Sequence, residues 1–330
     1  MPPTPRRETP SGSFLLKHDG PDIVYGKHVF TEEIMSLQFI KMAWIWLAQK
    51  KWACRLIVKF GLFVLLFLVI TMPNPWLTVK QIAAYIDIEA LLNPDFPQMK
   101  EINAAIDARL PLHSTFNEEY QTIVKFVYDS IRYEFDWDNW QNSEYWPSAV
   151  DVWQRKREDC DGRAILAASI FRSRGYSDAT VVASLRHLWI KVGNQELMGP
   201  DKEKLMIVEK GKKHFLLPSL NYMLESFADQ LYYYPLSRMV LILCGSLILL
   251  FHPHKSSILF LTLLATANFG LILIVDWSRY VSYYGQMKLT LGFIAGSLLM
   301  FASIVTAWRP QWCRIILCSR KLNIHKTEIS

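Results

Sequence analysis

Residues 158–176, EDCDGRAILAASIFRSRGY, are the stretch of this 330-residue chain that says most about its fold. Asp159 is of a residue type that caps helix N-termini, and apolar residues follow it at helical spacing. The segment ends at Gly175, and glycine is favoured just after the last residue of a helix. The pattern therefore predicts a helix that begins near Cys160 and buries one face.

Two runs rich in β-branched and aromatic residues follow this helix, and they predict strands. They are ATVVASL at 179–185 and HLWIKV at 187–192. His187 opens the second run, and Asp201 comes 14 residues later, after a Met-Gly-Pro break. We expect an α+β domain in which the helix that carries Cys160 packs on a sheet that carries His187 and then Asp201.

The cysteines argue for a reactive thiol rather than for disulfide bonds. The chain has five, and only Cys160 lies between residues 73 and 235, so this segment cannot hold an internal disulfide. Cys160 stands in the predicted first turn of a helix, where unpaired amides and the positive end of the helix dipole favour the thiolate. We therefore expect Cys160 to be a nucleophile whose pKa lies below that of a free thiol.

His187 and Asp201 are the predicted partners of Cys160. A histidine close to a thiol takes or shares its proton, and a carboxylate beside the imidazole fixes the tautomer and supports the positive charge. The position of Asp201 depends on how the turn before it is placed. Glu196 and Asp178 are therefore alternatives for the orienting acid.

These motifs resemble the core of the transglutaminase-like superfamily. The shared features are a cysteine at a helix start in an Asp-Cys-x-Gly setting, a histidine in a His-x-Trp strand, and an aspartate a short strand later. The resemblance spans residues 115–205 and implies a papain-like core, with the cysteine helix packed on an antiparallel sheet. It implies that Cys160 is the nucleophile, His187 the base and Asp201 the orienting acid. Glu158 stands where the family often has glycine, which leaves these three residues untouched.

The resemblance also implies a reaction, the attack of a thiolate on an amide carbonyl through a thioester acyl-enzyme. We expect a membrane-tethered cysteine peptidase of the bacterial transglutaminase-like type, which cleaves protein or peptide amides without a cofactor. Two alternatives stay open. One is a protein-glutamine transamidase, in which an amine replaces water, and the other is a non-catalytic binding or scaffold protein.

Three acidic residues in the segment EFDWDNW raise the question of a metal. Glu134, Asp136 and Asp138 alternate along it and could offer oxygen ligands to Ca²⁺. Some bacterial transglutaminase-like cysteine peptidases use calcium. A solvated acidic loop is the preferred interpretation, so the sequence predicts no metal site.

Hydrophobic residues make up 51% of the chain, and the excess over an ordinary soluble protein lies in four apolar runs. The runs are 56–72, 239–251, 258–275 and 289–308, of which 239–251 is short for a membrane span. We expect a mobile tail at 1–30, an interfacial helix and first transmembrane anchor at 31–72, a transglutaminase-like catalytic domain at 73–235, a membrane region with about three transmembrane helices at 236–308, and a basic cytoplasmic tail at 309–330.

Charge follows the same division. Residues 1–72 carry a net charge of +4, residues 73–235 carry −5 and residues 236–330 carry +7, within a total of +6. The basic excess belongs to the membrane flanks, so nucleic-acid binding is not expected. With four spans, the positive-inside rule places both termini in the cytoplasm and the catalytic domain across a cell membrane, expected to be a bacterial inner membrane. The expected partners are a protein or peptide substrate, the lipid bilayer, and membrane proteins that pack on the spans.

Overall fold

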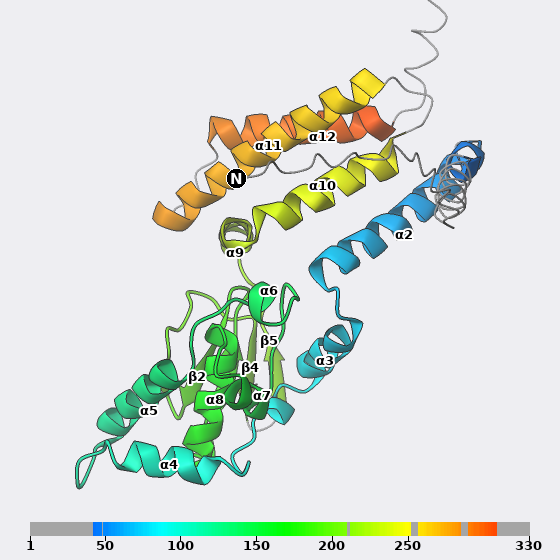
Figure 1. The fold of residues 1–330 in the computed structure, drawn as a ribbon. Coiled ribbons are helices and arrows are strands. Elements are labelled where there is room, and N and C mark those ends of the chain that lie inside the picture. Colours follow the sequence, from blue (N-terminus) through cyan, green and yellow to red (C-terminus); the bar gives the residue numbers. More distant parts are fainter. Residues whose placement is uncertain (1–41, 48, 210–211, 252–256, 285–289, 309–330) are drawn as a thin grey trace, which may run out of the picture. The chain divides into compact units, whose positions relative to one another are not determined.

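The structure is a computed structural model that describes residues 42–47, 49–209, 212–251, 257–284 and 290–308 (Figure 1). The predicted tails at 1–30 and 309–330, and residues 31–41 of the predicted interfacial helix, lie outside the described residues. The chain divides into two compact units, Met1–Trp52 and Ala53–Ser330. In the first unit, residues 42–47 are helical, and the Lys50 Nζ lies 4.3 Å from the centroid of the Trp46 ring.

Helices dominate the second unit before the sheet. They are α2 (Trp52–Thr71), α3 (Pro75–Ile86), the 3₁₀ helix η1 (Glu89–Leu91), α4 (Met99–Asp107), α5 (Phe116–Ser130), α6 (Asp136–Asn139), α7 (Ala149–Arg155) and α8 (Cys160–Ser173). Capping boxes explain two of the starts: Thr115 with Glu118 opens α5, and Ser148 with Asp151 opens α7. The Asn74 side chain caps α3 in the same way that Asp159 caps α8.

Five strands form one antiparallel sheet in the order β3-β2-β1-β4-β5. They are β1 (Thr180–Ala183), β2 (Leu188–Val192), β3 (Gln195–Leu197), β4 (Met206–Glu209) and β5 (Lys212–Phe215). In the register of β1 with β2, Val182 lies opposite Trp189, and both side chains are fully buried. The protein is thus a mostly helical α+β structure with an antiparallel sheet, which confirms the predicted fold class at that level.

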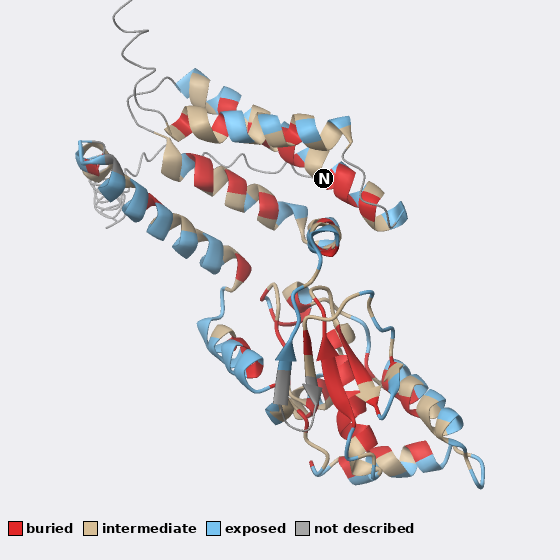
Figure 2. Ribbon diagram, turned by 180° about the vertical axis from the view of Figure 1, so that it is seen from behind, coloured by how far each residue is buried: buried red, intermediate tan, exposed pale blue. Residues whose placement is uncertain are grey.

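Helix α8 is the centre of the core. Every residue from Asp161 to Phe171 is buried, as Figure 2 shows for this helix and for the strands beside it. It packs on β1 and β2 and also touches α4, α5 and α7. The prediction of one buried face was too narrow, because other elements surround the helix. Small residues such as Ala164, Ala167 and Ala168 allow this close packing.

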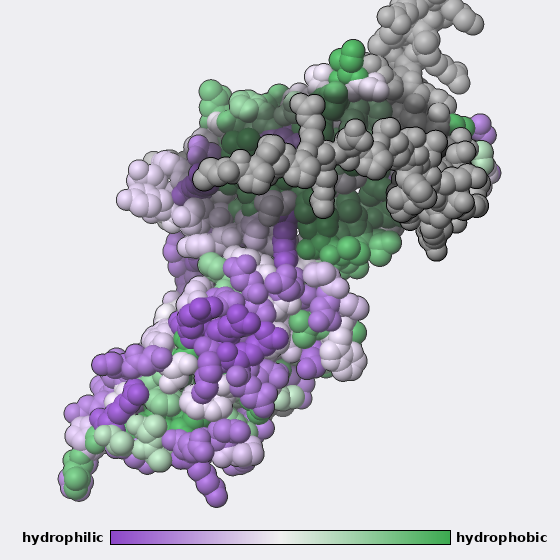
Figure 3. Space-filling model, viewed as in Figure 1, coloured by the Kyte–Doolittle hydropathy of each residue, from purple (hydrophilic) through white to green (hydrophobic). Residues whose placement is uncertain are grey.

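Four helices follow the sheet: α9 (Leu220–Tyr233), α10 (Leu236–Leu250), α11 (Ser257–Tyr284) and α12 (Leu291–Trp308). Three helical stretches of the described chain are long and apolar enough to cross a membrane, at Ala53–Thr71, Ser257–Tyr284 and Leu291–Trp308. They correspond to three of the four predicted runs. Figure 3 shows hydrophobic residues gathered over α2 and α10, and hydrophilic residues over the part that carries the sheet.

The fourth predicted run corresponds to α10, which has 15 residues. At 1.5 Å per residue it is about 22 Å long, less than the ~30 Å of a hydrocarbon core. It reaches spanning length only together with α9, from which it is bent by 103°. The described residues therefore contain three helices long and apolar enough to span a membrane, or four such segments if the bent pair is one broken span. The predicted topology, with an even number of spans, requires the second case.

Helix α9 touches both parts that the predicted boundary at residue 235 separates. Its Ala228 is buried with Trp277 and Val281 of α11. On the other side, the Gln230 side chain donates to the Leu185 carbonyl at 3.1 Å, just before β2. The helix therefore connects the sheet to the long apolar helix α11.

Helices α11 and α12 pack closely through glycine. A Cβ placed on Gly270 would lie 2.7 Å from the Gly296 carbonyl oxygen, and one placed on Gly296 would lie 2.6 Å from the Gly270 oxygen. No larger residue fits at these distances, so the two backbones approach each other as small residues allow in membrane helices.

Candidate active site

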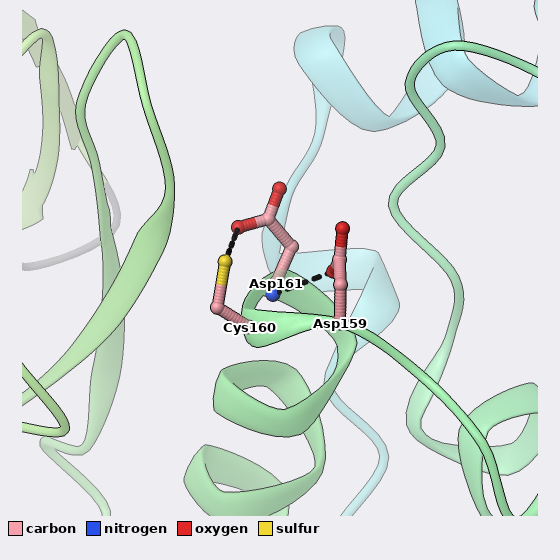
Figure 4. Close-up of side chains that lie close together, drawn as sticks. All are labelled: Asp159, Cys160 and Asp161. Atoms are coloured by element: carbon pink, nitrogen blue, oxygen red, sulfur yellow. Dashed lines mark hydrogen bonds between the residues drawn. The ribbon is translucent and has the colours of Figure 1, made fainter. Parts of the chain in front are cut away.

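Cys160 is the first residue of α8, as the capping pattern predicts. The Asp159 side chain caps the helix by accepting the backbone N–H of Asp161 at 2.9 Å (Figure 4). Cys160 is a half-buried free thiol. Its Sγ atom therefore belongs to the end of the helix where backbone N–H groups lack helical partners.

Asp161 joins the start of α8 to the start of β2. Its Oδ1 accepts the Leu188 backbone N–H at 2.6 Å and also accepts a bond from the Cys160 Sγ at 3.4 Å. Its Oδ2 accepts the Trp146 indole N–H at 3.1 Å. Because Leu188 directly follows His187, this carboxylate holds the predicted nucleophile and the predicted base in the same region. Asp161 was not among the predicted site residues, although its place beside the thiol in the first helical turn is a usable signal.

His187 lies just before β2 and has a buried ring nitrogen without a partner. Its backbone is held by Ser184, whose Oγ accepts the His187 N–H at 3.1 Å and whose N–H donates to the His187 carbonyl at 3.0 Å. The ring packs edge-on against Trp189, with centroids 5.5 Å apart. No described residue bonds to the buried Nε2 atom. Burial lowers the pKa of His187, and the nearby Asp201 only partly opposes this, so the neutral imidazole is favoured.

Asp201 is bonded to residues other than His187. Both of its carboxylate oxygens accept hydrogen bonds from the Arg186 guanidinium, one of them at 2.9 Å. The Tyr222 hydroxyl donates at 2.6 Å and the Lys202 backbone N–H at 2.7 Å. Burial raises the pKa of Asp201, but these bonds outweigh it and hold the pKa well below its usual value. Asp201 therefore influences His187 as a nearby charge and not through a hydrogen bond.

The alternatives to Asp201 have other partners. Glu196 forms an ion pair with Lys204. Asp178 accepts the backbone N–H of Gly193 at 2.8 Å, in the turn after β2. A cavity of about 1760 Å³ is lined by Asp201 but not by Glu196 or Asp178.

Cys160, His187 and Asp201 line one cavity of about 1760 Å³. The structure thus brings the three predicted residues to a common space. No hydrogen bond among the described residues joins one of the three to another. The arrangement is a thiol and an unbonded imidazole nitrogen beside one cavity, with a carboxylate held nearby by Arg186.

The expected low pKa of the thiol is contradicted. Burial raises the pKa of Cys160 well above its usual value, and the carboxylates of Asp161 and Asp159 raise it further. The thiol proton is bonded to Asp161, which stabilises the neutral form. The amides at the helix start favour a thiolate, but burial and the two flanking carboxylates outweigh them here.

Five carboxyl groups gather around the start of α8. They are Asp136, Glu144, Glu158, Asp159 and Asp161, and each has a pKa above its ordinary value. Burial is the main cause, and neighbouring carboxylates add to it. It raises the pKa of Glu144 to about 7 and those of Glu158 and Asp161 to about 8. The cluster therefore holds protons at neutral pH.

Two overlapping groups of side chains around the start of α8 could hold a metal ion, since the ligand atoms of each group lie within 4.8 Å of one another. They are Asp136 with Glu158 and Asp159, and Asp159 with Cys160 and Asp161. Oxygen ligands suit Ca²⁺ or Mg²⁺. Protons can neutralise the same carboxylates, as the raised pKa values indicate, so the geometry alone does not require a metal.

The acidic residues considered as a calcium site lie in different environments in the structure. Glu134 pairs with Arg132 and, at 2.9 Å, with Arg157. Asp136 is only 2% exposed, and its Oδ2 accepts the Tyr145 backbone N–H at 2.6 Å. The preferred interpretation as a solvated acidic loop is wrong for Asp136, because the segment folds back and buries it.

Glu158 is a structural residue of the site. It is fully buried and accepts hydrogen bonds from the Asn139 amide at 3.0 Å and from the Trp140 indole at 2.9 Å. A Cβ on Gly162 would lie 2.0 Å from the Glu158 Cγ, so glycine at 162 is what leaves room for this side chain. The departure from the family pattern at 158 is thus tied to the packing of α8.

Searches against protein-family models, curated proteins and solved structures find no match to this chain.

Proposed function

We propose that this chain is a membrane-bound thiol hydrolase of the transglutaminase-like type, which cleaves protein or peptide amides as a cysteine peptidase. One observation supports this most: Cys160 and His187 line the same cavity, and the buried Nε2 of His187 has no partner among the described residues. A buried polar atom without a hydrogen bond is costly, so its presence indicates a function. Accepting the proton of a nucleophilic thiol is such a function.

The reaction starts from a neutral pair. Because the pKa of Cys160 is raised and that of His187 is lowered, thiol and imidazole are favoured over thiolate and imidazolium. The thiol first leaves its bond to Asp161 and turns toward His187. Its proton then moves to Nε2 while Sγ bonds to the substrate carbonyl carbon, which is general base catalysis of nucleophilic attack.

The remaining steps return the proton. The imidazolium of His187 protonates the leaving amine as the C–N bond breaks, which leaves an acyl thioester on Cys160. Water then attacks the thioester carbonyl and gives one proton to the imidazole of His187. The C–S bond breaks, the carboxylic acid product leaves, and the proton passes from His187 to the Cys160 thiolate. Backbone N–H groups at the start of α8 stabilise the oxyanion both when the thioester forms and when water hydrolyses it. The negative charge of Asp201 stabilises the imidazolium of His187.

Two other functions share parts of this site. A protein-glutamine transamidase forms the same thioester and differs only in the acceptor, an amine in place of water. A binding or scaffold role is favoured by one observation, the bond from Cys160 to Asp161 that stabilises an unreactive thiol. The hydrolase proposal explains the unpartnered His187 nitrogen, which a binding role leaves without a reason.

The proposed side of the membrane follows from the distribution of basic residues and from the number of spans. We infer that the residues between α2 and α9 face the outside of a cell membrane, because the basic residues flank the other ends of the spans. A bacterial inner membrane suits this arrangement. The placement requires that α9 and α10 together cross the bilayer once.

Capture of the acyl-enzyme tests the proposed function. Membranes that contain the full chain are treated with a thiol-directed acyl probe, and the labelled residue is identified by mass spectrometry. We expect the label on Cys160, with none at this position in Cys160→Ser. His187→Ala should slow labelling by about 10²-fold or more, since a general base is removed.

The control is Cys54→Ser, which removes an exposed cysteine of α2 and should leave the labelling of Cys160 unchanged. All variants are compared at equal abundance in the membrane. A Cys160→Ser protein that keeps the full biological activity of the chain would favour the binding role and rule out the hydrolase.

A further inference from the structure

We infer that the substrate is a lipid-anchored peptide, whose acyl chain lies among α2, α10 and α12 while an amide close to the lipid reaches Cys160. This inference rests on the proposed hydrolase function and adds the class of substrate. It is carried by the shape and lining of the cavity beside Cys160 and not by the catalytic residues.

The cavity is continuous from the thiol to the membrane helices. Its lining includes Cys160 and His187, and it also includes apolar side chains of three other helices. These are Phe60, Phe63 and Phe67 of α2, Ile242 and Leu249 of α10, and Met300 and Ile304 of α12. A site for a soluble peptide needs no such extension, whereas a hydrocarbon chain is stabilised by this lining.

The length of the lining suits a long acyl chain. On α2 it runs from Leu56 to Thr71, which is roughly 22 Å at 1.5 Å per residue. Thr71 lies at the end of α2 that meets the segment between α6 and α7, where its carbonyl accepts the Ser143 backbone N–H at 2.8 Å. A chain that enters at Cys160 can therefore extend along most of α2.

Contacts between α2 and α10 limit what can enter. The Lys59 Nζ donates to the Leu250 carbonyl at 3.0 Å, and a Cβ on Gly245 would lie 2.6 Å from Leu66 Cδ2. The two helices therefore touch at two levels of the cavity. A whole transmembrane helix is 10–12 Å across, about the width of α2 or α10 itself, and cannot pass between them. A single hydrocarbon chain needs far less width.

The charge near Cys160 separates a lipopeptide from a phospholipid. Asp159 and Asp161 flank the thiol, and Glu144 also lines the cavity. These acidic groups offer a phosphate no cation, and Arg186, which also lines the cavity, is already paired with Asp201 and Asp229. A phosphate group placed here would have to be desolvated without a free cationic partner, whereas the amide of an acylated peptide is uncharged and avoids most of that cost.

Binding is tested separately from catalysis. Cys160→Ser protein in nanodiscs is irradiated with an N-palmitoyl peptide that carries a diazirine near the end of its acyl chain. We expect cross-links to lining residues of α2 and α10, which an unlabelled N-palmitoyl peptide removes by competition and the same peptide without palmitate does not. Cross-links that a soluble short-chain phospholipid removes equally well, or their absence from these helices, would overturn the inference.

Hydrolysis gives the second measurement. Two fluorogenic peptides of the same sequence, with and without N-palmitoyl, are offered to the wild-type chain in nanodiscs. We expect kcat/KM to be higher for the acylated peptide by about tenfold or more, because the buried chain adds apolar contacts. Ile242→Trp fills the cavity and should reduce this ratio. Leu241→Trp is the matched control, since Leu241 is 57% exposed on the same helix and does not line the cavity.

The outcomes separate the two proposals. Equal hydrolysis of the two peptides would leave the hydrolase standing and overturn the lipid-anchored substrate. No hydrolysis of either peptide, with competed cross-links on α2 and α10, would support lipopeptide binding and count against the hydrolase. An equal loss of preference in Ile242→Trp and Leu241→Trp would also count against the cavity as the site of the acyl chain.

Discussion

The Asp161 carboxylate accepts the backbone N–H of Leu188 at 2.6 Å, so the residue after Cys160 holds the residue after His187. The same oxygen, Oδ1, accepts the bond from the Cys160 thiol. One side chain therefore positions the strand that follows the proposed base, His187, and also stabilises the neutral thiol of the proposed nucleophile, Cys160. In the proposed reaction the bond from Cys160 to Asp161 breaks, while the bond from Leu188 to Asp161 stays.

Asp161→Asn should make Cys160 more reactive. Asparagine keeps an oxygen acceptor for the Leu188 N–H, and the Trp146 indole retains Glu144 as an acceptor at 2.9 Å. Above pH 8, where Asp161 is ionised in the wild type, the variant lacks this negative charge beside the thiol, so the pKa of Cys160 should fall. We expect iodoacetamide to alkylate Cys160 about tenfold faster at pH 9, which corresponds to a decrease of about one pKa unit.

The control for this measurement is Asp178→Asn, which removes an exposed carboxylate distant in the fold from the start of α8. Its alkylation profile should match that of the wild type, in which Cys160 titrates above a free thiol. A wild-type profile with a midpoint below that of a free thiol would contradict the protonated resting state.

Asp201→Asn should shift the pH dependence of catalysis to lower pH. The carboxylate raises the pKa of His187 as a nearby charge, so its neutralisation should lower that pKa further. The fall of kcat/KM at low pH (the acid limb) reports protonation of the general base in the free enzyme, so it should move to lower pH together with this pKa. Tyr222→Phe removes a single bond to Asp201 and keeps its charge, so it should leave the limb in place. A larger shift in Tyr222→Phe than in Asp201→Asn would show that Asp201 acts by its bonds and not by its charge.

Glu158→Ala should destabilise the sheet domain by about 2–4 kcal/mol. The change leaves the Asn139 amide and the Trp140 indole buried without their acceptor, and it opens a cavity beside Gly162. Thermal unfolding of the full chain in nanodiscs, followed by tryptophan fluorescence, measures the loss. Asp95→Ala at an exposed acidic position should change the midpoint little. Equal midpoints for the two variants would remove the structural role of Glu158.

The folded protein should lose stability as the pH rises from about 5 to 8. Glu144 titrates at about 7 in the folded state, and Glu158 and Asp161 at about 8, all above their unfolded values. Over this interval the folded state binds more protons than the unfolded state, so the free energy of unfolding decreases. Each pKa unit is worth about 1.4 kcal/mol. Glu144→Gln removes one titrating group and should make the dependence of the unfolding midpoint on pH less steep.

Topology should depend on whether α9 and α10 cross the membrane together. A reporter inserted after Leu217, which is 96% exposed before α9, should be active only outside the cytoplasm. A reporter fused at Ser330 should be active only in the cytoplasm if the bent pair is one span. Activity of both reporters on the outside would mean three spans, with α10 confined to one side.

The local pattern was enough to predict the cysteine helix and the span-length helices. Asp159 caps α8, Cys160 opens it, and the strand before the turn at Gly193 follows, because capping, apolar spacing and turn chemistry act over a few residues. The apolar runs at 56–72, 258–275 and 289–308 correspond to long helices for the same reason. Such interactions depend only on neighbours along the chain.

The electrostatics of the site were decided by tertiary structure. Glu144 and Glu158 reach the start of α8 from distant positions in the sequence, and Arg186 takes both oxygens of Asp201. The pKa of Cys160 depends on burial and on which carboxylates surround it, and neither is visible in the spacing of residues. Burial weakens solvation of every charge at once, so only the folded arrangement determines whether a thiol at a helix start is charged or neutral.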